Sequence, residues 1–213
     1  VLLTGTPVRE EFLFAKRQEA RQALGLGEEP LVVSCWGSLG AREMNKKIAQ
    51  FMKCECEENT PFHHIHATGS FGWRWMPEYV KELGVDLAAH PRIDMREYIY
   101  DMPQVLAAAD LIVCRAGAAT IAEVCASGTP CIMVPSPNVT GNHQEKNARV
   151  LERSGAAAVV READCDGKSL YETAKAILSD AGRMRAMRAS ARDMAVVDAA
   201  ERIYQTALDL AKH

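Results

Sequence analysis

The 213-residue sequence contains no apolar run long enough to span a bilayer, no signal peptide and no excess of positive charge. The first two absences lead us to expect neither a membrane-spanning nor a secreted chain. Lys and Arg number 25 against 28 Asp and Glu, which gives a formal net charge of −3. Because nucleic-acid binding depends on a basic surface, and no RNA- or DNA-binding motif is present, we expect no nucleic-acid partner.

The seven cysteines lack the spacing of a structural framework. Their odd number and the absence of C-x-x-C pairs argue against a disulfide framework and against a structural zinc site. Cys54 and Cys56 precede a cluster of His63, His64 and His66, so a metal site is an alternative, but this spacing matches no standard zinc ligand set. Most other cysteines lie in apolar runs, where we expect them to be small buried residues. Cysteines without a disulfide framework are typical of a reducing cytoplasm. We therefore expect no metal and no cofactor.

The chain alternates short apolar runs with helical patterns at regular spacing. Apolar runs predict strands near residues 31–35, 63–67, 92–98, 111–114, 131–134 and 157–160. Helical patterns occupy residues 41–54, 76–83, 101–109, 119–127 and 143–154, and then 170–178, 184–194 and 199–211. This alternation predicts an α/β fold with a doubly wound parallel sheet that is Rossmann-like. In such sheets, ligands bind beyond the carboxyl ends of the strands.

The most informative junction joins the apolar run 111–114 to the small residues that follow it. A strand ends there, the chain turns with little side-chain bulk, and a helix opens on Thr120 with Glu123 one turn further. The first turn of a helix has unpaired N–H groups and the positive end of the helix dipole, so it suits a phosphate. Glu123 can accept hydrogen bonds from sugar hydroxyls beside that phosphate, which fits a nucleotide sugar. The alternative is a capping box, in which Thr120 and Glu123 only satisfy backbone donors.

A second strand-to-helix turn has the sequence Gly37-Ser38-Leu39-Gly40-Ala41. Its backbone amides and the Ser38 hydroxyl can donate hydrogen bonds to a diphosphate. It lacks the Gly-Lys-Ser/Thr ending of a P-loop and the G-x-G-x-x-G pattern, so ATP hydrolysis and NAD binding are disfavoured. The alternative for this segment is a simple tight turn.

Residues 97–102 form a third loop at the predicted ligand edge. The main chain of Ile99 can pair with the edge of a base while its side chain packs on the ring. Alternatively, this segment only starts a helix, with Asp101 as the cap and Pro103 in the first turn. The spacing alone favours the second interpretation.

The fourth loop is polar and leads into a helix that carries His143, Gln144 and Asn147. Their spacing places these side chains on neighbouring faces of the helix, about one turn apart in pairs. Amide groups recognise sugar hydroxyls well, because each amide has both donors and an acceptor. The alternative is a capped and solvated helix start.

Five segments occur in the order and spacing of the MurG family of bacterial UDP-N-acetylglucosamine transferases. They are residues 5–9, 37–41, 98–102, 115–123 and 143–148. The resemblance covers nearly the whole chain, but only the C-terminal half of the family's two-domain GT-B architecture. It implies an inverting enzyme that transfers GlcNAc from UDP-GlcNAc to lipid I and so makes lipid II for peptidoglycan synthesis.

The resemblance implies a role in donor binding for nine residues. Arg9 and Ile99 would lie by the uracil, and Ile99 would bind it through its backbone. Ser38, Ala119 and Thr120 would contact the diphosphate, and Glu123 would hold the ribose hydroxyls. Gln144, with His143 and Asn147 beside it, would bind the GlcNAc hydroxyls.

Two features bear on the chemistry that this resemblance implies. Trp36 stands where the family usually has glycine, so the bulky indole either narrows the phosphate turn or packs beneath it. None of the four loops contains an Asp-x-Asp pair, which agrees with catalysis that lacks a metal bridge. We find no general base in this sequence; His143 is the nearest candidate, and we assign it to binding.

The family's N-terminal half would carry a second glycine-rich loop with a histidine, the lipid I contacts and a hydrophobic membrane-docking patch. We therefore expect residues 1–213 to form a single donor-binding domain that turns nothing over by itself. Residues 198–213 are expected to form a terminal helix that packs on the absent domain. For the parent protein, the resemblance implies a cytoplasmic location, peripheral on the inner face of the bacterial plasma membrane.

Two alternatives to this interpretation stay open. The chain could be the donor-binding subunit of a split UDP-GlcNAc transferase, in which a partner chain supplies the acceptor site. It could also belong to another GT-B enzyme, such as a glycolipid glucosyltransferase or a UDP-GlcNAc 2-epimerase. Donor preference and acceptor assays separate these enzymes.

Overall fold

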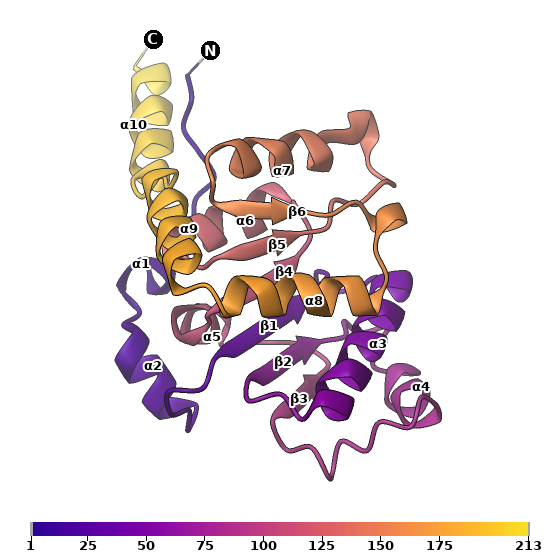
Figure 1. Ribbon diagram of the computed structural model, residues 1–213. Helices are drawn as coiled ribbons and strands as arrows, with labels where there is room; N and C mark the ends of the chain where they lie inside the picture. Colours follow the sequence, from indigo (N-terminus) through magenta and orange to yellow (C-terminus); the bar gives the residue numbers. More distant parts are fainter. Residues whose placement is uncertain (1, 213) are drawn as a thin grey trace.

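A six-stranded parallel sheet forms the centre of the molecule, and helices cover both of its faces (Figure 1). The computed structural model describes residues 2–212. The strands are β1 (Leu31–Cys35), β2 (His63–Ala67), β3 (Ile93–Arg96), β4 (Leu111–Cys114), β5 (Cys131–Met133) and β6 (Ala157–Val159). They pair in the order β3-β2-β1-β4-β5-β6, and every neighbouring pair is parallel. The predicted α/β fold with a doubly wound sheet is confirmed.

Helices connect the strands and close the chain. They are α1 (Glu11–Phe14), α2 (Arg17–Ala23), α3 (Arg42–Glu58), α4 (Met76–Glu82), α5 (Met102–Ala108), α6 (Ala118–Ser127), α7 (His143–Arg153), α8 (Gly167–Leu178), α9 (Ala181–Asp193) and α10 (Ala199–Ala211), with the 3₁₀ turns η1 (Thr140–Asn142) and η2 (Glu162–Asp164). The sequence analysis predicts neither α1 nor α2; the four residues of α1 are about one helical turn, which is too short to display a helical period.

Two helices begin earlier than their apolar patterns indicate, and polar caps explain both differences. Helix α8 follows Asp166, whose side chain accepts a hydrogen bond from the Ser169 N–H at 2.8 Å in a capping box. Helix α9 follows Asp180, whose side chain accepts from the Arg183 N–H at 2.9 Å. Each cap adds a first turn of small or polar residues, which apolar periodicity does not reveal.

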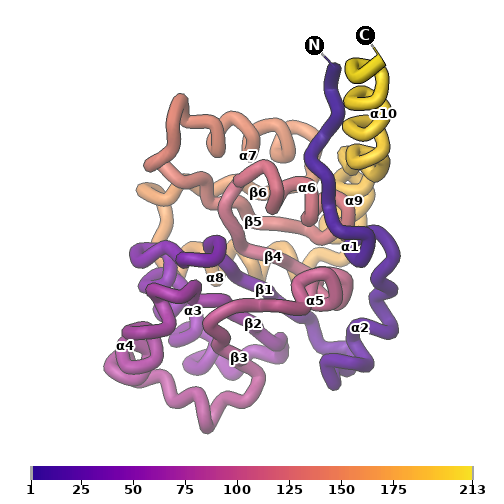
Figure 2. Tube along the Cα trace, turned by 180° about the vertical axis from the view of Figure 1, so that it is seen from behind, coloured from indigo at the N-terminus to yellow at the C-terminus, as the bar shows by residue number. Residues whose placement is uncertain are grey.

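The sheet lies between two apolar layers because side chains alternate along each strand. In β1, Leu31 and Val33 belong to one layer and Val32 belongs to the other. The first layer includes buried residues of α1, α2, α5, α6 and α7, and the second includes those of α3, α4 and α8. Figure 1 shows α8 on the near side of the sheet, and Figure 2, seen from behind, shows α5 on the near side. Helix α9 contributes Met187 to the second layer and Ala191 to the first.

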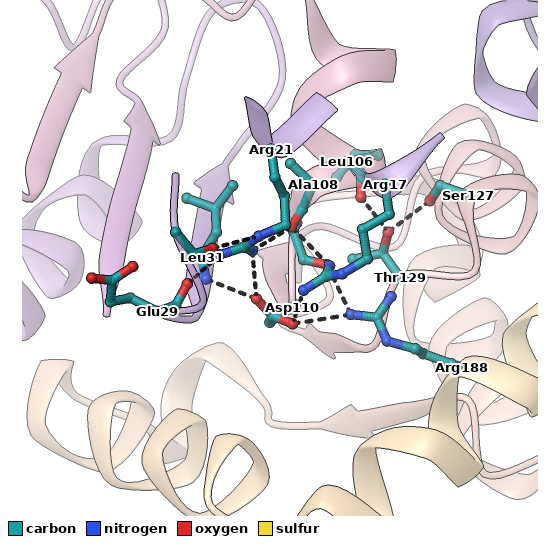
Figure 3. A network of polar contacts seen from close by, with 12 residues as sticks. Arg17, Arg21, Glu29, Leu31, Leu106, Ala108, Asp110, Ser127, Thr129 and Arg188 are labelled. Carbon is teal, nitrogen blue, oxygen red and sulfur yellow. Dashed lines mark hydrogen bonds and ion pairs between the residues drawn. The ribbon is translucent and has the colours of Figure 1, made fainter. Parts of the chain in front are cut away.

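Asp110 joins β1, β4, α2 and α9 at the amino ends of the two central strands (Figure 3). Its carboxylate accepts a hydrogen bond from the Leu31 N–H at 2.9 Å, and its own N–H donates to the Leu31 carbonyl at 2.8 Å. Arg17 and Arg21 of α2 and Arg188 of α9 contact the same carboxylate at 2.6, 3.2 and 3.2 Å. This cluster fixes the register of β1 against β4 and holds two distant helices against the sheet.

The segment before α1 runs beside α10, so the two ends of the chain lie near each other (Figures 1 and 2). Gly5 has a φ of +80°, and a Cβ at this position would lie 2.8 Å from a side-chain carbon of Val196. Only glycine fits such a close approach in this backbone conformation. Beside this segment, α10 exposes Ile203 and Tyr204. That the helix predicted over 198–213 packs on another domain stays a prediction, and residues 1 and 213 lie outside the described part.

A buried chain of polar groups runs beneath the second apolar layer. The Ser34 hydroxyl lies 2.7 Å from His64 Nε2 and 2.7 Å from His66 Nδ1, and His64 Nδ1 lies 2.9 Å from the Glu55 carboxylate. All four residues are buried. Burial lowers the pKa of His66 well below its usual value, and the neighbouring His64 adds to this effect. Two of the clustered histidines in the sequence therefore satisfy polar groups of the core.

Removal of Asp110 tests the cluster that joins the central strands. Asp110→Ala leaves three guanidinium groups without their carboxylate and the Leu31 N–H without its side-chain acceptor. We expect the free energy of unfolding to fall by about 3–5 kcal/mol, measured by urea unfolding. The matched control Asp209→Ala removes an exposed carboxylate that contacts Lys212 at 3.5 Å, and it should change stability by less than about 0.5 kcal/mol. An Asp110→Ala variant as stable as the control would contradict this account.

The buried His66 predicts a fall in stability at mildly acidic pH. Because folding lowers the pKa of this histidine, the unfolded chain binds its proton more readily than the folded chain does. Its contribution is complete above about pH 6.5 and is lost as the pH falls from there towards the folded pKa, with a slope of up to about 1.4 kcal/mol per pH unit. Urea unfolding at several pH values should show this slope, reduced in His66→Gln and retained in the surface variant His143→Gln. An equal slope in all three proteins would disprove the assignment.

Candidate functional site

The candidate site lies at the carboxyl ends of β1 and β4, the two central strands. These strands are neighbours, yet the chain leaves β1 for α3 on one face of the sheet and leaves β4 for α6 on the other. Loops that diverge in this way leave a crevice between them, which is the usual ligand position in open α/β sheets.

A cleft of about 430 Å³ occupies this crevice, a volume typical of small-molecule sites. Residues from the segment before α1, from the loops after β1 and β3, and from the first two turns of α6 line it. Five of the nine residues that we predicted to bind a ligand are among them: Arg9, Ser38, Ile99, Thr120 and Glu123. The lining also includes residues without a predicted role: Cys35, Gly37, Tyr98, Tyr100 and Met102.

Helix α6 offers unpaired backbone donors at the cleft. It begins at Ala118, one residue before the predicted range 119–127, and its N-cap is Gly117, which has no side chain to cap with. Among residues 2–212, no hydrogen bond uses the N–H groups of Ala118, Ala119 or Thr120. The capping-box alternative is therefore wrong: Thr120 is the third helical residue, and neither it nor Glu123 caps the helix. The open first turn and the helix dipole together favour an anion.

Glu123 places a carboxylate in the same cleft, one turn further along α6. It is half-buried, and this burial raises its pKa above the ordinary value for a glutamate, while the positive charge of Arg9 partly opposes the effect. Arg9 comes from the segment before α1, where its guanidinium also lies 5.4 Å from the ring centre of Phe12. The hydrogen-bond acceptor Glu123 and the hydrogen-bond donor Arg9 come from distant parts of the chain and line the same cleft.

The turn after β1 presents Ser38 to the cleft and buries Trp36 below it. Gly37 has a φ of +82°, a conformation that glycine adopts without strain. Trp36 packs in the apolar layer that α3 and α8 cover, and the guanidinium of Arg115 lies 5.7 Å from its ring centre. Of the two effects that we expected from a tryptophan at this position, the structure shows packing beneath the turn.

The loop after β3 brings a backbone edge and two aromatic rings to the cleft. The Ile99 side chain is buried, and within residues 2–212 its N–H and C=O make no hydrogen bond to another backbone group. Tyr98 and Tyr100 are exposed, with ring centres 4.9 Å apart in an edge-to-face arrangement. We predicted no role for these rings, although their positions on both sides of Ile99 were visible in the sequence. Asp101 is the N-cap residue of α5, as predicted, but its carboxylate makes no capping hydrogen bond and contacts Arg96 instead, at 3.4 Å.

The polar residues at the start of α7 do not line this cleft. The Gln144 side-chain oxygen accepts hydrogen bonds from the N–H groups of Ala116 and Ser136, at 3.3 and 2.9 Å. Asn147 donates to the Ala116 carbonyl at 3.3 Å, and the ring of the exposed His143 contacts a backbone carbonyl at 3.0 Å. Gln144 therefore connects the loop after β4 to the loop after β5, and only its NH₂ group is left for a ligand.

Other features of the sequence lie away from the cleft. Within residues 2–212, no group of three or more His, Cys, Asp or Glu side chains is arranged to hold a metal ion. Cys54 and Cys56 lie on α3, and burial raises the pKa of the Cys56 thiol to about 11. In the same part of the chain, we find no helix with the length and apolar character that crossing a bilayer requires.

Comparison with known proteins identifies relatives over nearly all of the chain. The sequence model of the glycosyltransferase family 28 C-terminal domain matches residues 31–203. A protein of Acetivibrio thermocellus named UDP-N-acetylglucosamine--N-acetylmuramyl-(pentapeptide) pyrophosphoryl-undecaprenol N-acetylglucosamine transferase is 40% identical, covering 100% of this chain and 56% of the relative. A protein of the same name from Caldanaerobacter subterraneus subsp. tengcongensis is 42% identical, with 96% and 55% covered.

The crystal structure of Acinetobacter baumannii MurG superposes on the chain with a TM-score of 0.73 and 25% sequence identity. The superposition covers 94% of this chain and 56% of that structure. The chain thus spans a little over half the length of the relatives that it matches.

Substitution of Gln144 tests its role as the connection between two loops. Gln144→Leu keeps the size of the side chain but removes the acceptor of two backbone N–H groups. We expect the free energy of unfolding to fall by about 1–3 kcal/mol, with faster hydrogen exchange at the Ala116 and Ser136 amides. Gln205→Leu, which removes an exposed amide on α10, is the matched control and should leave both measurements unchanged. Unchanged exchange at both amides in Gln144→Leu would contradict the connection.

Proposed function

The chain belongs to the family of glycosyltransferase family 28 C-terminal domains, and from this premise we propose that it binds UDP-N-acetylglucosamine as a sugar donor. The names of its curated relatives support GlcNAc as the transferred group. For the complete enzyme, the proposed reaction transfers GlcNAc to the lipid-linked muramyl pentapeptide, lipid I, to give lipid II for peptidoglycan. This chain contributes the donor half of that reaction, and the acceptor contacts come from the remainder of the enzyme.

The observation that carries this proposal is the open first turn of α6, with Glu123 facing the same cleft. In the proposed complex, the diphosphate accepts hydrogen bonds from the N–H groups around Ala119 and Thr120 and from Ser38. Glu123 accepts hydrogen bonds from the ribose hydroxyls, one helical turn away. The turn after β1 and the first two turns of α6 would thus hold the diphosphate and the ribose of the donor.

The base and the sugar would contact residues other than those that hold the diphosphate. The backbone N–H and C=O of Ile99, which are unpaired among residues 2–212, suit the edge of a uracil, and Arg9 lines the same cleft. The GlcNAc hydroxyls would meet the free NH₂ group of Gln144, with His143 and Asn147 as neighbours. Since the Gln144 oxygen already binds two backbone groups, its orientation is fixed before the sugar arrives.

The proposed chemistry is an inverting displacement at the anomeric carbon of GlcNAc. The oxygen of the muramoyl 4-hydroxyl attacks that carbon and gives up its proton to a base outside this chain, and UDP leaves with additional negative charge on its terminal phosphate. The N–H groups and the dipole of α6 would stabilise this charge where it develops. The four predicted ligand loops contain no Asp-x-Asp pair, which supports a mechanism in which these groups act without a metal bridge.

The proposed acceptor also suggests where the enzyme works. A polyprenyl-linked acceptor stays in the bilayer, so we propose that the complete enzyme acts on the inner face of the bacterial plasma membrane as a peripheral protein. Helix α10 would pack on the domain that binds the acceptor, since it exposes large apolar side chains in this chain.

Calorimetric titration with UDP-GlcNAc, UDP-glucose and UDP tests donor binding. We expect UDP-GlcNAc to bind more tightly than UDP-glucose. Glu123→Ala should weaken UDP-GlcNAc binding by roughly 10- to 100-fold, because hydrogen bonds to a charged group contribute about 1.5–3 kcal/mol. Glu201→Ala, an exposed glutamate on α10, is the control and should bind as the wild type does. No binding of any of the three ligands, or equal binding by Glu123→Ala, would contradict the proposed donor site.

A further inference from the structure

A second cavity, of about 290 Å³, lies at the amino ends of β2 and β3, whereas the donor cleft lies at carboxyl ends of the sheet. The last turn of α3 and the loop before β3 surround it. Phe62 and Ile93 give it an apolar wall, and Glu55, His90 and Arg92 contribute polar groups. An apolar wall with a few polar groups is the usual composition of a small-molecule site, and the proposed reaction does not use this cavity.

Backbone hydrogen bonds fix the walls of this cavity. On one side, the Thr60 N–H donates to the Glu55 carbonyl at 3.1 Å, which holds the end of α3 in place. On the other side, the His64 N–H donates to the Arg92 carbonyl at 2.8 Å. Arg92 is therefore attached to the residue of β2 whose ring also contacts the Glu55 carboxylate.

The buried polar chain beside the cavity determines how Glu55 is used. His66 Nδ1 lies 3.2 Å from the Ser34 carbonyl, which can only accept, so this nitrogen carries the hydrogen. It also donates to the Ser34 hydroxyl, which then donates to His64 Nε2. A neutral His64 therefore carries its hydrogen on Nδ1 and donates it to Glu55 Oε2, at 2.9 Å. Each donor in this chain thus points toward Glu55.

The second carboxylate oxygen of Glu55 is left without a donor. Within residues 2–212, Oε1 makes no hydrogen bond, although the residue is only 4% exposed. A buried acceptor without a partner is unfavourable, and more so when the group is a carboxylate. Because Glu55 lines the cavity, a ligand there can supply the missing donor. An ammonium group suits this position, since hydrogen bonds between charged groups are the stronger ones.

The exposed side of the cavity carries a positive charge. Within residues 2–212, the guanidinium of Arg92 donates only to the Thr60 carbonyl, at 3.2 Å, and forms no ion pair. Its other N–H donors stay available, and their planar arrangement suits a carboxylate. The cavity thus presents an acceptor on its buried side and a cation on its exposed side.

We propose that this cavity is a binding site for a free amino acid. The ammonium group of the ligand donates to Glu55, its carboxylate pairs with Arg92, and an apolar side chain packs on Phe62 and Ile93. A simple amine has no partner for Arg92, and a simple carboxylate has none for Glu55, so a zwitterion matches the cavity best. This site shares no residue with the donor cleft, and the inference does not depend on the proposed function.

Titration of the ¹⁵N-labelled chain with L-leucine tests the site, and two analogues separate its two charges. The first, 4-methylpentanoate, lacks the ammonium group of leucine, and the second, 3-methylbutylamine, lacks its carboxylate. We expect leucine to shift the amides of Thr60, Arg92 and Ile93 saturably. Each analogue should bind at least roughly tenfold more weakly, because it loses hydrogen bonds to a charged group.

Three outcomes of this titration would overturn the proposal. They are no saturable shift with leucine, an analogue that binds as tightly as leucine, and shifts at Ser38 and Thr120 in place of the amides around the cavity. The last outcome would place leucine in the donor cleft.

Substitutions test the two charged residues. Glu55→Gln keeps an oxygen that accepts from His64 but places an NH₂ group where Oε1 lies, so it should weaken leucine binding by roughly tenfold or more. Arg92→Gln should weaken it by a similar factor. Glu57→Gln, on the same helix, and Arg185→Gln, on α9, alter exposed residues and are the matched controls that should bind as the wild type does.

Undiminished leucine binding by Arg92→Gln, or by a folded Glu55→Gln, would overturn the proposal. Urea unfolding checks that Glu55→Gln is folded, because this substitution alters a buried group. Arg92 is exposed, so its variant should fold as the wild type does and decides the test if Glu55→Gln is unstable.

Discussion

The hydrogen bonds between Asp110 and Leu31 are the constraint on which the rest of the structure depends. They set the register of β1 against β4 at the amino ends of both strands. Because the strands are parallel, this register also determines where their carboxyl ends stop and their loops diverge. The ion cluster at the amino ends of the strands therefore helps to determine the geometry of the cleft at their carboxyl ends. Arg17 and Arg188 neutralise the buried carboxylate and bring α2 and α9 into the same unit.

In the candidate site, each loop is held in place by a contact that leaves free the groups that we propose to bind a ligand. Gln144 binds the N–H groups of Ala116 in the loop after β4 and of Ser136 in the loop after β5, and among residues 2–212 the N–H groups in the first turn of α6 stay unpaired. Trp36 supports the turn after β1 from below, and Ser38 stays exposed. Burial of the Ile99 side chain leaves its backbone edge available. The proposed site is thus organised before the donor binds, which lowers the entropic cost of binding.

The sequence was most informative where a single physical rule determines the outcome. Buried parallel strands need short apolar runs, so all six strands could be predicted, and loops after such strands made Ser38 and Glu123 candidates for the cleft. Contacts between distant residues could not be predicted in this way. An amide such as Gln144 suits a sugar hydroxyl and a backbone N–H equally well, and only the fold shows which one it binds. Asp101 stands in the position of a helix cap, but a nearby arginine competes for its carboxylate.

The central claim is that the open first turn of α6 binds the diphosphate of a nucleotide sugar. Amide chemical shifts of the ¹⁵N-labelled chain, recorded during titration with UDP-GlcNAc, test it most directly. The account predicts that the amides of Ala118, Ala119 and Thr120 shift most, together with that of Ser38. Saturable binding that leaves these four amides unmoved and shifts residues elsewhere would contradict it.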